Sequence, residues 1–135
     1  MKFFHSVKTA ASPDKIWSVW TDVANWKKWD YQLEYARIDK FASGHMGVMK
    51  SRRAKEFNFF VEDVTNDKIT IAVKLPLATL RINRHVKKLQ RGCEFTHETS
   101  FEGTLGFAYG LAFGRRFKKE LPIVMGKVKE MAEST

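Results

Sequence analysis

The alternation of apolar and polar residues divides the chain into a mixed N-terminal part, a run of strands and a final helix. Residues 2–9 alternate weakly, which predicts a first strand. Ser12 is then a favourable N-cap residue, and Pro13 suits the first position of a helix. We therefore expect a helix over residues 13–22, followed by a short helical turn over residues 23–28 that carries Trp26.

Turn residues separate six runs with strand character between Tyr31 and Gly103. We expect strands over residues 31–40, 46–53, 56–64, 68–75, 79–89 and 93–102. The last two form the best hairpin candidate, joined near Arg91 and Gly92. A loop of those two residues would place Arg84 opposite Thr99, with His97 one diagonal step away on the same inward face.

The C-terminal segment, residues 104–134, has the spacing of one long helix. Its apolar stripe comprises Tyr109, Phe113, Phe117, Leu121, Val124, Met125 and Val128. Pro122 predicts a kink, or another partner for the carbonyl that it leaves unbonded. Gly106, Gly110 and Gly114 recur every fourth residue and leave one side of the helix bare. Two explanations stay open: close packing against another element, or a loosely held helix end that acts as a gate.

Three segments resemble the SRPBCC superfamily, which includes the START-like and polyketide cyclase/dehydrase proteins. They are A-S-P-D-K-I-W-S-V-W-T-D-V-A-N-W-K-K-W-D at residues 11–30, the Phe41-x-x-Gly44-x-x-Gly47 spacing, and G-C-E-F-T-H-E-T-S-F-E-G at residues 92–103. The resemblance implies an α+β helix-grip (START-like) fold. In that fold a curved antiparallel β-sheet and two short N-terminal helices wrap around a long C-terminal helix and enclose an apolar pocket. It also implies a single ligand-binding domain over residues 1–135.

Composition narrows the classes of partner. The 135 residues include 11 Phe and four Trp, an aromatic content suited to lining a cavity. A net charge of +9 favours an encounter with nucleic acid, an acidic lipid surface or an acidic small molecule. The basic residues are scattered, and no zinc finger or RNA-recognition signature accompanies them. We therefore expect no nucleic-acid partner, and interpret most of the charge as a solvated face.

The remaining features bear on location. A single cysteine, Cys93, excludes an internal disulfide, as is usual in a reducing compartment. The longest apolar run, residues 105–114, is about half of what a membrane span requires. With no signal-peptide pattern at the start, the sequence predicts a cytoplasmic protein without integral membrane association.

Two residues on the predicted inward face are the best candidates for chemistry. His97 could bond a ligand or exchange a proton near pH 7, or it could be a satisfied core histidine. Arg84 could pair with the acid group of a ligand, or lie at the rim of the sheet and reach water. The four histidines lack metal-ligand spacing, and the known nucleophile and phosphate-loop motifs are absent. We expect no metal and no cofactor.

The sequence thus predicts a module that binds a hydrophobic or amphipathic small molecule, with an acid-bearing lipid, fatty acid or aromatic compound preferred. The predicted ligand-binding residues are Arg84, His97, Phe95, Phe101, Ile82, Tyr109, Phe113, Phe59, Ile71 and Trp29. Two alternatives stay open: a polyketide cyclase/dehydratase-like enzyme with His97 as its candidate catalytic residue, and a protein that uses its basic surface to bind a partner. We expect a monomer or a weak homodimer.

Overall fold

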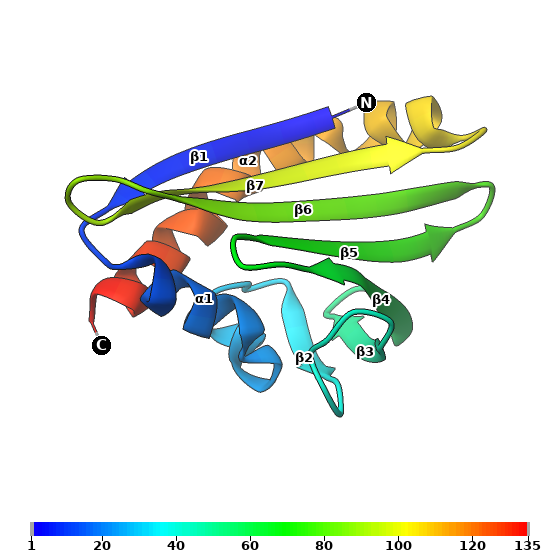
Figure 1. The fold of residues 1–135 in the computed structure, drawn as a ribbon. Helices are drawn as coiled ribbons and strands as arrows, with labels where there is room; N and C mark the ends of the chain where they lie inside the picture. The colour runs from blue at the N-terminus through cyan, green and yellow to red at the C-terminus, as the bar shows by residue number, and fades with distance from the viewer. Residues whose placement is uncertain (1, 135) are drawn as a thin grey trace.

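The computed structural model describes residues 2–134 and contains the elements expected from the sequence in the expected order (Figure 1). They are β1 (Lys2–Thr9), α1 (Pro13–Thr21), the 3₁₀ helix η1 (Val23–Lys28), β2 (Leu33–Arg37), β3 (Met46–Ser51), β4 (Phe57–Val64), β5 (Lys68–Leu75), β6 (Ala78–Lys88), β7 (Cys93–Glu102) and α2 (Gly106–Glu133). The sequence placed β1, β5, β7 and η1 at their observed limits. The strand predicted over residues 31–40 is longer at both ends than the observed β2.

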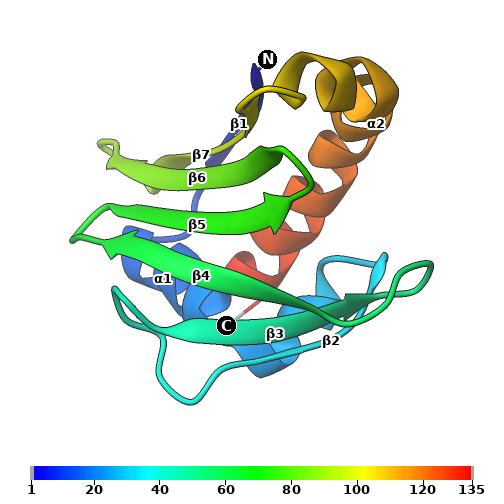
Figure 2. The same ribbon diagram turned by 90° about the vertical axis from the view of Figure 1, so that its right-hand side faces the viewer.

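The seven strands form one antiparallel sheet in the order β1-β7-β6-β5-β4-β3-β2. The sheet curves around α2, which runs along its inner side from near the N-terminus to the neighbourhood of α1 (Figure 2). This arrangement confirms the predicted α+β architecture of a curved sheet, two short helices and a long C-terminal helix. Neither α1 nor α2 is long and apolar enough to cross a membrane, and the same holds for every helix of residues 2–134.

The start of α1 differs from the prediction in one detail. Ser12 is the N-cap residue, but its side chain makes no capping hydrogen bond. Its carbonyl instead accepts hydrogen bonds from the Lys15 and Ile16 amides, and Pro13 fixes the first helical position. Ile16, Val19 and Trp20 then face the core, as their three-to-four spacing in an amphipathic helix allows.

The predicted register of the β6–β7 hairpin is wrong by two residues. Lys88 pairs with Cys93, so the loop has four residues rather than two, and Gly92 adopts a positive φ of 72° in it. A shift of two preserves the face of each side chain but changes its partner. Arg84 therefore lies directly opposite His97 rather than opposite Thr99.

The apolar stripe predicted for α2 is buried in its second half, and in its first half Tyr109 and Phe117 are half-buried against Phe101. Leu121, Val124, Met125 and Val128 are buried, and the helix continues past Pro122 without a break. In the first half, Gly106, Gly110 and Gly114 are the buried positions, whereas Phe113 is exposed. The backbone of α2 thus lies too close to the sheet for side chains there, which favours close packing over a loosely held end.

At two of these glycines there is no room for a side chain. A β-carbon on Gly106 would come within 2.7 Å of the Phe101 carbonyl oxygen, and one on Gly114 within 2.6 Å of the Phe3 ring. The same helix offers a control, because a β-carbon on Gly126 would meet nothing within 4 Å.

We predict that Gly114→Ala lowers the free energy of unfolding by about 1–2 kcal/mol. The clash with the buried Phe3 ring should outweigh a gain in helix propensity of about 1 kcal/mol. Gly126→Ala should be neutral or stabilising by up to about 1 kcal/mol, since only the propensity term operates there. Urea denaturation of the three proteins measures both effects, and equal stabilisation by both substitutions would contradict the close contact at Gly114.

Candidate functional site

The inner face of the sheet carries a buried cation. Arg84 on β6 is only 5% exposed, so the alternative in which it lies at the rim of the sheet and reaches water is wrong. Ile69 of β5 lies on one side of it and His97 of β7 on the other, in register. His5 of the edge strand β1 pairs with His97, so one row across the sheet carries Arg84, His97 and His5 on the same face.

Two tryptophans enclose the Arg84 guanidinium from the side of η1. Its central carbon lies 5.1 Å from the ring centre of Trp26 and 5.1 Å from that of Trp29. A 3₁₀ helix has three residues per turn, which places residues 26 and 29 on one side of the segment. Each cation–π contact in a desolvated setting is worth about 2 kcal/mol, which offsets part of the cost of burying the charge.

The hydrogen bonds of this cluster are incomplete. Nε and Nη1 of Arg84 and Nε1 of Trp29 are buried without an acceptor, and they are the buried side-chain nitrogen or oxygen atoms without a partner in residues 2–134. By contrast, Nε1 of Trp26 donates to the Trp20 carbonyl at 2.8 Å. All three unsatisfied atoms are donors, so the site lacks acceptors only.

Acidic groups lie beside the cluster without completing it. Asp30 directly follows Trp29, and its carboxylate accepts a hydrogen bond from the Gln32 amide at 3.1 Å. Burial raises the pKa of Asp30 and outweighs the lowering by that hydrogen bond and by the charge of Arg84, while Glu120 of α2 raises it further. No ion pair joins Asp30 to Arg84 among the described residues. Burial lowers the pKa of Arg84 to about 10, although the charge of Asp30 acts in the opposite direction.

His97 is held neutral. It is 8% exposed, and burial together with the neighbouring Arg84 charge lowers its pKa well below the usual value. No side-chain hydrogen bond joins it to another residue in 2–134, so the alternative of a core histidine bonded to a neighbour is wrong. A neutral imidazole can donate one hydrogen bond and accept one.

The other predicted site residues separate into two groups. Phe59, Ile71 and Phe95 are fully buried in the main core with Trp29, and Ile82 is half-buried against it. A second cluster lies under the first half of α2, where Phe101 stacks with Tyr109 at 6.0 Å and with Phe113 at 6.3 Å between ring centres. Leu75 and Leu80 contact both clusters and are half-buried.

Sequence reasoning missed Trp26, Asp30 and Glu120 as members of the site. The three-residue spacing of Trp26 and Trp29, with Asp30 immediately after, was the available signal. Glu120 could not be found in this way, because only the packing of α2 brings it near Asp30.

Within the described residues, no group of three or more His, Cys, Asp or Glu side chains is arranged to hold a metal ion.

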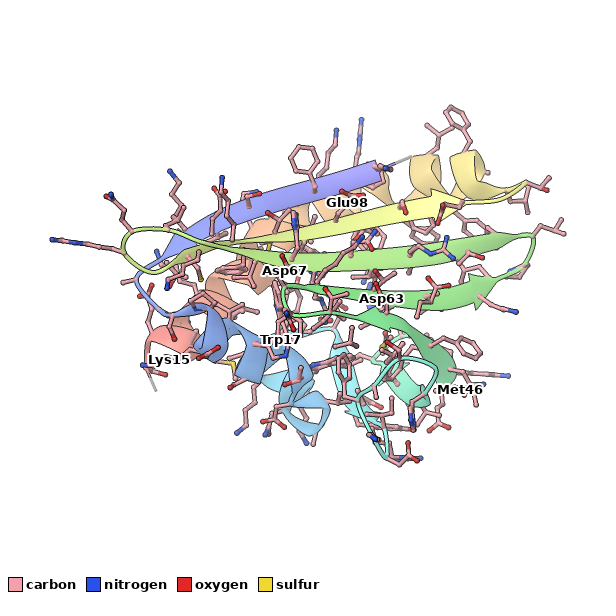
Figure 3. The ribbon with its side chains drawn as sticks, viewed as in Figure 1. Lys15, Trp17, Met46, Asp63, Asp67 and Glu98 are labelled. Carbon is pink, nitrogen blue, oxygen red and sulfur yellow. The ribbon has the colours of Figure 1, made fainter. Side chains whose placement is uncertain are left out.

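A surface hollow of about 480 Å³ lies between α1, the β4–β5 turn and β6. It is lined by Pro13, Asp14, Trp17, Val64, Thr65, Asn66 and Val86. Figure 3 shows Trp17 on α1 below the turn that carries Asp67. Val86 is on the inner face of β6, but neither Arg84 nor His97 lines the hollow.

Comparison with solved structures assigns the fold. A START superfamily protein from Mycobacterium smegmatis superposes with a TM-score of 0.76 at 13% identity, over 98% of this chain and 97% of that one. The di-domain aromatase/cyclase StfQ of the steffimycin pathway gives a TM-score of 0.80 at 12% identity, over 98% of this chain and 50% of that one. The chain has the START-like helix-grip fold.

This helix-grip fold also occurs in norcoclaurine synthase from Thalictrum flavum, which superposes with a TM-score of 0.73 at 14% identity, over 97% of this chain and 92% of that one. One structure of that enzyme contains dopamine and hydroxybenzaldehyde. No family model and no curated protein sequence matches this chain. At these identities the comparisons establish the fold of the chain and neither an activity nor a ligand.

The low pKa of His97 predicts an acid-dependent loss of stability. In the unfolded chain the imidazole takes up a proton near pH 6.5, whereas in the folded protein it stays neutral to lower pH. The unfolded state therefore binds more protons below pH 6.5. As the pH falls below that value, this group should lower the free energy of unfolding by up to about 1.4 kcal/mol per pH unit.

Urea denaturation at pH 7, 6 and 5 should show a smaller loss of stability for His97→Gln than for the wild type. His85 is exposed on the opposite face, so His85→Gln is the matched control. Identical pH slopes for His97→Gln and the wild type would contradict a buried neutral His97.

Proposed function

We propose that this protein binds a small amphipathic acid, with the acid group at Arg84 and Trp29 and the apolar body along the inner face of the sheet. On this proposal the whole chain acts as a single START-like ligand-binding domain. Pockets of this class are mostly apolar, with a few polar groups that fix the orientation of the ligand.

The observation that carries the proposal is the set of three buried donors without an acceptor. Leaving a buried hydrogen-bonding group unpaired costs about 1–3 kcal/mol, and more for a charged group. A carboxylate would accept from Arg84 and Trp29 and would supply the negative charge that Arg84 lacks. A neutral alcohol could accept hydrogen bonds but would leave the charge uncompensated.

Uneven burial along β6 supports this place for the apolar body of the ligand. Ile82 and Leu80 point to the same inner face as Arg84, yet both are only half-buried. Leu75, Tyr109 and Phe117 around them are half-buried as well, in contrast to the fully buried Ile71. This part of the inner face, between Arg84 and the Phe101 cluster, is thus incompletely covered. An apolar chain or ring laid there would remove these side chains from water.

His97 supports a second candidate function, a polyketide cyclase-like proton transfer. Its neutral imidazole lies directly opposite Arg84. If a carbonyl oxygen accepted a hydrogen bond from Arg84, that charge would stabilise the enolate formed when His97 removed a proton from the adjacent carbon.

For the binding function we predict that the wild type prefers dodecanoic acid to dodecan-1-ol by about ten- to hundredfold, the range expected of a charged hydrogen-bonded pair. Arg84→Met should lose this preference and still bind the alcohol. Its unliganded form should be as stable as the wild type or more so, because a buried cation is replaced by an apolar side chain. Tryptophan fluorescence is a suitable readout, since two indole rings lie against Arg84.

Arg81→Met is the matched control for Arg84→Met. Arg81 lies on the outer face, where it pairs with Glu62 at 2.6 Å and with Glu102. It should keep the preference for the acid. Equal affinity of the wild type for acid and alcohol, or an unchanged preference in Arg84→Met, would refute the proposed acid site.

For the second candidate we predict that the wild type accelerates deuterium exchange at the central carbon of benzoylacetone, measured by NMR in D₂O. His97→Gln should fold normally and lose the acceleration, whereas His85→Gln should keep it. Exchange at the uncatalysed rate with the wild type would rule out this activity for a 1,3-diketone.

A further inference from the structure

The first half of α2 presents an outer surface that the packing of the fold does not explain. Phe107, Leu111, Arg115 and Lys119 follow one another at intervals of four residues and therefore form one ridge along the helix. Phe107 is 65% exposed and Leu111 63% exposed, and both basic residues are exposed. We call these four residues the α2 ridge.

The α2 ridge lies at a corner of the molecule. Its first residues directly follow Gly106 and Gly110, which face the sheet, so Phe107 and Leu111 flank the contact without being covered by it. Leu77 in the β5–β6 turn is 68% exposed, and its carbonyl accepts a hydrogen bond from the Leu105 amide at 2.9 Å. Figures 1 and 2 place this turn and the first turns of α2 at the same end of the molecule. Exposed apolar side chains thus gather at that end.

The charge around the α2 ridge has one sign. Residues 103–119 contain no Asp or Glu. Glu120 is the first acidic residue after them, and it pairs with Arg116, which in turn donates to Gln32 at 3.2 Å. Among residues 2–134, Arg115 and Lys119 have no ion-pair partner. The ridge therefore combines two protruding apolar side chains with two uncompensated positive charges.

We propose that the α2 ridge is a docking surface for membranes that contain anionic phospholipid. Aromatic and leucine side chains at the edge of a helix insert at the boundary between headgroups and acyl chains, and adjacent Lys and Arg are attracted to anionic lipid. A symmetric contact between the ridges of two copies would instead remove Arg115 and Lys119 from water with no acidic partner, because residues 103–119 contain no Asp or Glu. A nucleic acid would use the charges and leave Phe107 and Leu111 in water. This inference goes beyond the proposed acid ligand and does not depend on it.

The test is co-sedimentation of the purified chain with vesicles of phosphatidylcholine alone and of equimolar phosphatidylcholine and phosphatidylglycerol. We expect binding to the anionic vesicles that weakens with added salt, and little binding to the neutral ones. Neutralising Arg115 and Lys119 together, as Arg115→Gln with Lys119→Gln, should weaken binding about fivefold for each charge removed. Phe107→Ser with Leu111→Ser should weaken it about tenfold or more.

Phe4→Ser is the matched control, because Phe4 is 71% exposed on the outer face of β1, away from α2. It should bind anionic vesicles as the wild type does, and thermal unfolding of all variants checks that each is folded. Equal binding to neutral and anionic vesicles would overturn the proposal. So would ridge variants that bind like Phe4→Ser. A dimer in sedimentation analysis that Phe107→Ser with Leu111→Ser dissociates would assign the ridge to a second copy and overturn it as well.

Discussion

The burial of one arginine between two tryptophans is the constraint on which the interior of this protein depends. A guanidinium cannot be removed from water without compensation, and here the compensation comes from several elements at once. η1 and the Trp29 that follows it supply the two indole faces, and Asp30 supplies a negative charge nearby. If either group moved away, the net free-energy cost of burying the Arg84 charge would rise.

The compensation is partial, and the proposed acid site rests on the part that is missing. Two nitrogens of Arg84 and one of Trp29 have no acceptor, so the empty protein retains a free-energy cost that an acidic ligand would relieve. Arg81, on the outer face of the same strand, shows the contrast. It meets two carboxylates, and its charge is satisfied within the protein. Two arginines three residues apart thus differ in role because alternate residues of a strand face opposite sides of the sheet.

The glycines of α2 show how the same helix serves two surfaces. On the inner side, Gly106 and Gly114 let the backbone approach Phe101 and Phe3, which places Tyr109 and Phe113 against the Phe101 ring. On the outer side, the residues that follow these glycines stay exposed, and they include the apolar and basic members of the α2 ridge. A side chain in place of glycine would move the helix away from the sheet and alter both surfaces.

The sequence by itself determined the elements of this fold and the faces of its strands. Proline and glycine fixed where α1 begins and where the last hairpin turns, and two-residue alternation identified Arg84 and His97 as inward-facing. These signals are local, because each depends only on a few residues that are neighbours in the sequence. Only the tertiary structure decided the pairing of Arg84 with His97, because a four-residue loop and a two-residue loop leave the same faces inward. The tertiary structure also brought Trp26 and Asp30 to Arg84 and Glu120 to Asp30, and it decided that the glycines of α2 pack closely against the sheet. Such contacts join residues distant in sequence, and their energies depend on distances that no local pattern records.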